Sequence, residues 1–220
     1  MTYPFSFFIR NIFWVILALS LSITTAKAQQ QDAVLWLGAS AEKKVMKKLD
    51  ISFEQQVRFK QNMQQFNSSL SEVGLSYKLA KKVKIAGIYR YTVRRKTNSH
   101  RLSSHIQYKQ RIKPLKLNVS GRIKYQYDFT HLDYEQVLRP KVKLTYSRKK
   151  YDFEPFIANE WFYELDNRGN QFERFRITTG CNYHLHKQHD LSLFYTLQQA
   201  LNVPNPSQEH IFGINYSFNL

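Results

Sequence analysis

The stretch LNVSGRIKYQYD, residues 117–128, alternates apolar or aromatic residues with polar or charged ones. One face carries Val119 and Ile123, and the other face carries Arg122 and Lys124. Because successive side chains of a β-strand point to opposite faces, a period of two predicts a strand with one apolar face and one charged face. If such strands enclose a membrane barrel, the apolar face points outward to lipid and the charged face lines the interior.

The same period recurs almost from end to end after residue 28. It predicts strands over residues 33–41, 50–60, 69–79, 83–94, 101–112, 116–128, 134–146, 151–164, 172–185, 190–199 and 209–220. Most of these match or exceed the ~9–11 residues that a tilted strand needs to cross a bilayer, whereas soluble strands more often have about 5–6. The predicted fold class is all-β, a closed antiparallel up-and-down transmembrane β-barrel of about 10–12 strands. Ten or twelve strands are expected rather than eleven, because bacterial single-chain barrels normally have an even number.

The start of the chain has the pattern of an export signal. Arg10 precedes an apolar run over residues 12–23, and the small-x-small sequence Ala26-Lys27-Ala28 follows it. This predicts a signal peptide over residues 1–28, cleaved near Ala28, which leaves residues 29–220 as an outer-membrane barrel domain. The alternative is an uncleaved anchor, but the run is shorter than the ~18 residues typical of a spanning helix.

Composition is compatible with this architecture. The chain has 33 Lys and Arg against 16 Asp and Glu, a net charge of +17, and a mean hydropathy of −0.50. A low average hydropathy is expected for a barrel, because the alternation hides the apolar face. Cys181 is the only cysteine, so an internal disulfide is excluded. The basic residues are spread over nearly every strand and turn rather than gathered on one face, which argues against nucleic acid as a partner.

The C-terminus alternates up to the last residue. Its apolar positions are Phe212, Ile214, Tyr216, Phe218 and Leu220. Outer-membrane barrels commonly end in such a strand, and this one resembles the signal that the barrel assembly machinery recognises, with Leu220 in place of the usual terminal aromatic residue. The expected partners are therefore that machinery and outer-membrane lipids. The alternative is an ordinary half-buried terminal strand.

The charged faces are the candidate functional site. We predict a network of charges inside the lumen formed by Glu154, Glu160, Glu164, Arg174, Arg176, Arg122, Lys124 and Arg139. At least one carboxylate–guanidinium contact is expected between the strands at residues 151–164 and 172–185, because the DNRG sequence between them favours a hairpin. Two interpretations stay open: ion pairs that fill the interior, or a site or channel that attracts anions.

Two further patterns concern the ends of the strands. Tyrosine and tryptophan residues cluster there, as in the aromatic belts of membrane barrels. Basic residues gather at one set of turns and predict a positive collar at one end of the barrel, together with the C-terminus. They are Lys43, Lys44, Lys47, Lys48, Lys81, Lys82, Lys113, Lys116, Arg148, Lys149, Lys150 and Lys187.

Catalysis has a weak candidate only. Ser103 and His105 share one face of a predicted strand, and an acid such as Glu160 would have to come from elsewhere on the wall. Period-two spacing places both side chains on one face but does not establish a working triad. The cluster His184, His186 and His189 lies at a turn, where a solvated surface is favoured over a metal site. We therefore expect a non-enzymatic barrel without cofactor or metal, a narrow pore, binding or structural element. The alternatives are a lipid-modifying barrel enzyme and a soluble periplasmic ligand-binding barrel.

The second half of the chain resembles a known family. The residues that carry the resemblance are Arg139-Pro140, Glu154-Pro155-Phe156, Glu160, Phe162, Tyr163, Phe172, Arg174, Arg176, Gly180, Tyr183, His210-Ile211 and Tyr216-Ser217-Phe218. They are similar to the domain of unknown function 2490 family, a group of uncharacterised exported bacterial proteins, and the likeness extends loosely back to about Trp36. The resemblance implies an outer-membrane barrel, with no assigned activity and no catalytic residues.

Overall fold

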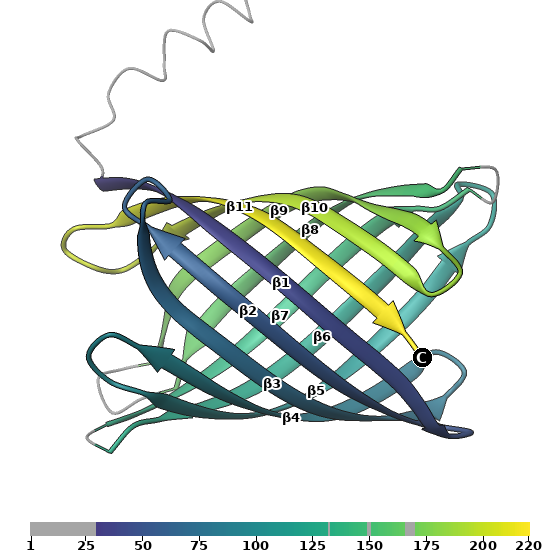
Figure 1. Ribbon diagram of the computed structural model, residues 1–220, viewed down its shortest axis with the longest axis horizontal. Helices are drawn as coiled ribbons and strands as arrows, with labels where there is room; N and C mark the ends of the chain where they lie inside the picture. The colour runs from purple at the N-terminus through teal and green to yellow at the C-terminus, as the bar shows by residue number, and fades with distance from the viewer. Residues whose placement is uncertain (1–29, 132, 149–150, 166–169) are drawn as a thin grey trace, which may run out of the picture. The chain divides into compact units, whose positions relative to one another are not determined.

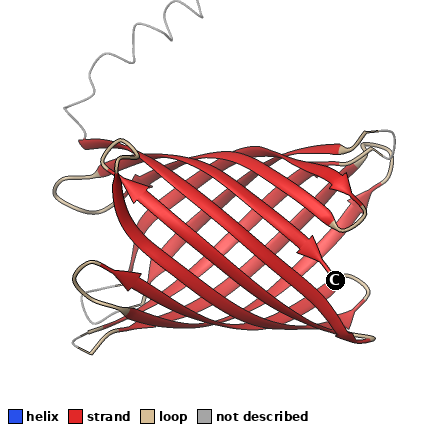
Figure 2. Ribbon diagram, viewed as in Figure 1, coloured by secondary structure: helices blue, strands red, loops and turns tan. Residues whose placement is uncertain are grey.

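The computed structural model describes residues 30–131, 133–148, 151–165 and 170–220. The predicted signal peptide lies outside the described residues. Within them the regular structure consists of eleven strands and no helix, so no helix there is long and apolar enough to cross a membrane (Figure 2). The strands are β1 (Gln30–Met46), β2 (Leu49–Lys60), β3 (Gln65–Ala80), β4 (Val83–Arg94), β5 (Ser99–Ile112), β6 (Leu117–Phe129), β7 (Tyr134–Tyr146), β8 (Phe153–Glu164), β9 (Gln171–His186), β10 (His189–Ala200) and β11 (Ser207–Asn219).

The strands form a closed barrel in sequence order. Each strand pairs antiparallel with the next, from β1–β2 to β10–β11, and β11 lies beside β1 to close the wall (Figure 1). Because the direction reverses at every step, strands β1 and β11 run the same way and the closing seam is parallel. The predicted closed up-and-down barrel is confirmed, and eleven described strands fall within the expected range of 10–12. The expectation of an even number is wrong, because a parallel seam also satisfies backbone hydrogen bonds.

The two faces of the wall have opposite character. At the midpoint of β6, Ile123 is 53% exposed on the outside, whereas its neighbour Lys124 is 6% exposed and faces the interior. Ile106 and Val142 are likewise about half exposed on the neighbouring strands. The predicted assignment of apolar residues to the outer face and charged residues to the inner face is therefore confirmed.

Aromatic rings contact one another near both ends of the outer wall. At the loop end, Tyr127 lies 5.6 Å from Phe129 and 5.8 Å from Tyr134, centroid to centroid. At the opposite end, the rings of His189 and Phe218 are 4.9 Å apart. Aromatic side chains thus gather at both ends of the wall, and their role as membrane belts stays a prediction.

Because strand direction alternates, successive connections lie at opposite ends of the barrel. The turns after β1, β3, β5, β7 and β9 share one end with Leu220, and the connections after the even-numbered strands share the other. We call these the turn end and the loop end. The described basic residues of the predicted collar therefore lie together at the turn end; Lys149 and Lys150 lie outside the described residues.

Candidate functional site

A polar cavity occupies the loop half of the interior of the described barrel, and we call it the chamber. Its volume is about 510 Å³, and all eleven strands contribute side chains to it. Lys60 and Arg94 lie at its loop-end mouth, and Arg122 and Lys141 lie near mid-barrel. Eleven of the described lining residues are Lys or Arg and five are Glu. The chamber is therefore strongly cationic.

Part of this charge is neutralised within the wall. Glu160 pairs with Arg122 at 2.9 Å and with Arg139 at 3.0 Å, so one carboxylate on β8 serves guanidinium groups on β6 and β7. Two further pairs join Arg90 to Glu72 at 2.6 Å and Arg101 to Asp128 at 2.5 Å, and Lys60 pairs with Glu209 at 2.9 Å near the mouth. Three of the predicted network residues, Glu160, Arg122 and Arg139, are thus brought together.

The other predicted network residues are placed differently. Arg176 faces Glu160 in register across the β8–β9 hairpin, but the ion pairs of Glu160 run to β6 and β7 instead. Arg174 lines the chamber and pairs with Glu173 at 2.6 Å. Glu154 lies at the turn end, where its carboxylate is 3.7 Å from His184, and so does not belong to the chamber.

The two remaining predicted positions also have a defined place. Glu164 is the last residue of β8 at the loop end and is in register with Val137. Lys124 lines the chamber, where it is buried. The DNRG segment of the predicted hairpin turn lies outside the described residues, but the antiparallel β8–β9 pairing that it predicted is confirmed.

Aromatic rings also contact the arginines of the chamber. The guanidinium carbon of Arg58 lies 4.1 Å from the ring centre of Trp36, and that of Arg176 lies 5.3 Å from the same ring. Arg139 and Arg176 also face Phe162, at 4.2 Å and 4.6 Å. Sequence reasoning missed Trp36 and Phe162 as site residues, although β8 has aromatic residues on both parities, which is a signal for an inward-facing ring.

An apolar cluster lies in the turn half of the interior, on strands β8 to β11. Phe156 and Phe194 point inward there, next to Gly180 and Gly213. A Cβ on Gly180 would lie 2.8 Å from both phenylalanine side chains, and one on Gly213 would enter the ring of Phe194. The glycines thus make room for the two rings inside the turn half of the barrel.

The candidate catalytic pair lacks its defining contact. Ser103 and His105 both face the interior of β5, but the Ser103 hydroxyl and the His105 Nδ1 are buried without a hydrogen-bond partner. No nucleophile–base hydrogen bond is formed between them. At the turn end, His184 contacts Asp190 at 2.5 Å, and no group of three or more metal-ligating side chains exists among the described residues.

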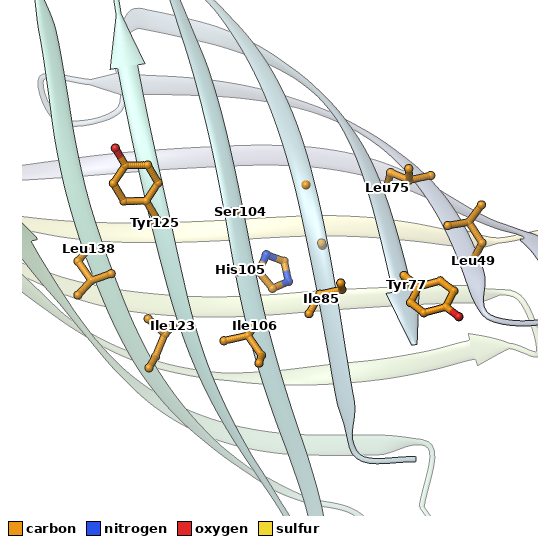
Figure 3. Close-up of a pocket in the computed structure, with 12 residues that line it drawn as sticks. Leu49, Leu75, Tyr77, Ile85, Ser104, His105, Ile106, Ile123, Tyr125 and Leu138 are labelled. Carbon is orange, nitrogen blue, oxygen red and sulfur yellow. The ribbon is translucent and has the colours of Figure 1, made fainter. Parts of the chain in front are cut away.

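The outer wall has a hollow over strands β4 and β5. Its volume is about 590 Å³, and it forms where Gly87 leaves no side chain beside Ser104. Figure 3 shows the apolar side chains around Ser104, among them Ile85, Ile106 and Tyr125. The hollow is almost wholly apolar and offers no cluster of charged groups for recognition.

The predicted assembly signal lies on the outer face of β11. Phe212, Ile214 and Tyr216 are partly exposed there, and Leu220 donates its backbone N–H to the carbonyl of Glu42 on β1 at 2.8 Å. The terminal residues therefore form both the outer wall and the closing seam.

A protein-family model matches most of the chain. The family model described as "Protein of unknown function (DUF2490)" matches residues 33–209, which is most of the chain. No curated protein matches the chain.

Proposed function

The chain belongs to the DUF2490 family of proteins of unknown function, and from that premise we propose that it is a non-enzymatic integral outer-membrane barrel. In this proposal the outer wall contacts lipid, and the chamber is a binding compartment that opens at the loop end. The inward-facing rings of Phe156 and Phe194 occupy part of the turn half of the interior, which supports a binding compartment over an open pore.

The distribution of apolar residues carries the proposal. Among the described residues, thirty-six large hydrophobic side chains are exposed, whereas seven hydrophobic residues form the buried core. A soluble barrel does the reverse, because burial of apolar surface drives its folding. An apolar wall of this extent is stable in a hydrocarbon environment, and closure leaves no unpaired strand edge in it.

The alternatives find less support. A soluble barrel with an apolar ligand inside needs an apolar interior, but this chamber is lined by charges. A lipid hydrolase needs a nucleophile in contact with a base, and Ser103 has no such partner. The non-enzymatic interpretation therefore stands as the proposal.

For the orientation, we propose that the turn end faces the periplasm and the loop end faces outward. Outer-membrane barrels have short periplasmic turns and longer external loops. The described basic residues of the turn end, such as Lys47 and Lys82, are exposed there, where they meet anionic headgroups or an acidic partner.

Cysteine labelling of intact cells tests location and orientation together. In a Cys181→Ser background, Asn205→Cys places a thiol in the exposed β10–β11 loop, and the matched Lys82→Cys places one in the exposed β3–β4 turn. A membrane-impermeant maleimide is expected to label residue 205 in intact cells and residue 82 only after lysis, with both variants in the outer-membrane fraction. Labelling of residue 82 from outside would overturn the orientation, and recovery in the soluble periplasmic fraction would overturn the membrane proposal.

A further inference from the structure

The chamber has more cationic side chains than carboxylates. Arg58 and Arg176 are among the lining cations that have no carboxylate within 4.0 Å in the described part of the chain, together with Arg94, Lys124 and Lys141. Their guanidinium groups donate instead to neutral amide oxygens, Arg58 to Gln56 at 2.7 Å and Arg176 to Gln198. A buried cation without a counter-charge is costly, so the missing negative charge has to come from the solution.

Arg58 and Arg176 contact the same aromatic ring. They come from β2 and β9, on either side of β1, and both stack on the ring of Trp36. Cation–π contact with the ring offsets only part of the cost of bringing two like charges together. Stacking also fixes each guanidinium plane and leaves its edge free to donate in a fork.

A third arginine has unused donor capacity in the same chamber. Arg139 donates to Gln126 at 2.7 Å and pairs with Glu160, yet its Nε–H has no hydrogen-bond partner. Arg139 is 8% exposed, so the bare N–H is not compensated by bulk solvent. Lys124, buried close to this group on the adjacent β6, adds an ammonium with no ion pair among the described residues.

From these contacts we propose that the chamber binds a small multivalent oxyanion, held by Arg58, Arg176 and Arg139 beside Trp36. The inference rests on the proposed binding role of the chamber and names its ligand class. Planar guanidinium forks match the paired oxygens of carboxylate and phosphate groups, and chloride cannot engage them in that way. The volume of about 510 Å³ admits a molecule the size of citrate or pyrophosphate but not a polymer.

Trp36 provides a direct readout. A Trp161→Phe variant leaves Trp36 as the only tryptophan after residue 28. The protein is isolated from membranes in a neutral detergent and titrated with potassium pyrophosphate, with potassium citrate, and with potassium chloride at equal ionic strength. A saturable change in Trp36 emission is expected with a multivalent anion and not with chloride. Tighter binding of pyrophosphate would indicate a phosphate ligand, and tighter binding of citrate would indicate a carboxylate ligand. Absence of a saturable change with both would overturn the proposal.

Matched variants separate a site from a general positive potential. Arg58→Gln and Arg176→Gln are each expected to weaken binding at least tenfold, since each removes a charge-assisted fork. Lys143→Gln is the control, because it removes one interior charge near Phe156 without lining the chamber. A loss in the control equal to that in the arginine variants would show that no defined site exists. If the glutamine variants fail to fold, Arg58→Lys and Arg176→Lys keep the charge and are expected to lose affinity through the missing fork.

Failure of the inference is distinguishable from failure of the proposed location. The titration is made in detergent and reports only on the chamber, whereas the cysteine labels report only on membrane and orientation. If the cysteine labels give the expected pattern but neither anion changes Trp36 emission, the proposed location stands and the proposed ligand class is wrong.

Discussion

Ile123→Arg tests whether the outer wall lies in hydrocarbon. Ile123 is at the exact centre of the thirteen-residue strand β6, its side chain is 53% exposed on the outer face, and it faces Ile106 and Pro140 on the neighbouring strands. An arginine on the lipid face at the bilayer midplane costs about 2–4 kcal/mol, falling to about 0–1 kcal/mol near the interface. Val119 lies only two residues inside the turn-end boundary of β6, so the central position gives the larger expected effect.

Leu115→Arg is the matched control for that substitution. Leu115 is 60% exposed in the β5–β6 turn, beyond the end of the strands. Equilibrium guanidinium unfolding in phospholipid vesicles, followed by tryptophan fluorescence, gives the free energy of unfolding of both variants. The membrane reasoning expects the central arginine to cost about 2 kcal/mol or more beyond the control. Equal costs would refute it, because an arginine at a half-exposed position in water changes stability by only about 0.5 kcal/mol.

Two further predictions concern the interior. Glu160→Gln leaves Arg122 and Arg139 without their carboxylate and is expected to lower the free energy of unfolding by about 3 kcal/mol, whereas Glu42→Gln, which removes an exposed partner of a lysine, costs less than about 1 kcal/mol. A similar cost for both in the vesicle unfolding assay would show that the interior pairs are fully solvated. Gly213→Val drives a side chain into the Phe194 ring and is expected to cost about 1–3 kcal/mol, with partial recovery in the double variant with Phe194→Leu; simple addition of the two costs would contradict the packing.

The sequence predicted the wall well because the alternation is strong. The predicted ranges 83–94 and 134–146 coincide with β4 and β7. The first strand is longer than predicted, since pairing with β2 continues to Met46, with Lys44 opposite Asp50. Periodicity ends where apolar residues end, but a backbone ladder continues as long as both strands remain paired. Whether the number of strands is odd or even was not predictable. Closure of a barrel depends on the tilt and stagger of its strands, which no local sequence pattern encodes.

The partners inside the lumen were harder to predict than its composition. Hairpin reasoning pairs Glu160 with Arg176, its neighbour in register, but the wall of a barrel curves around its contents. The carboxylate of β8 is therefore reached by Arg122 from β6, two strands away, since neighbouring strands are only about 4.8 Å apart and an arginine side chain is long. The inward orientation of Trp36 and Phe162 was not predicted for a different reason. A pattern of apolar and polar residues assigns every aromatic residue to the apolar face.

The odd strand count has a consequence for the proposed orientation. In an even-stranded barrel both ends of the wall finish on one side, whereas here β1 begins at the loop end and β11 finishes at the turn end. The last strand closes the wall through a parallel seam, where the Ser40 and Ser217 hydroxyls lie 2.9 Å apart and the backbone of Leu220 reaches Glu42. If the C-terminal strand stays at the periplasmic side, as the proposed orientation requires, the first residues of β1 have to reach the external side before the seam can form. In the proposed orientation we therefore expect closure of the barrel to follow translocation of its first strand, with the parallel seam pairing last.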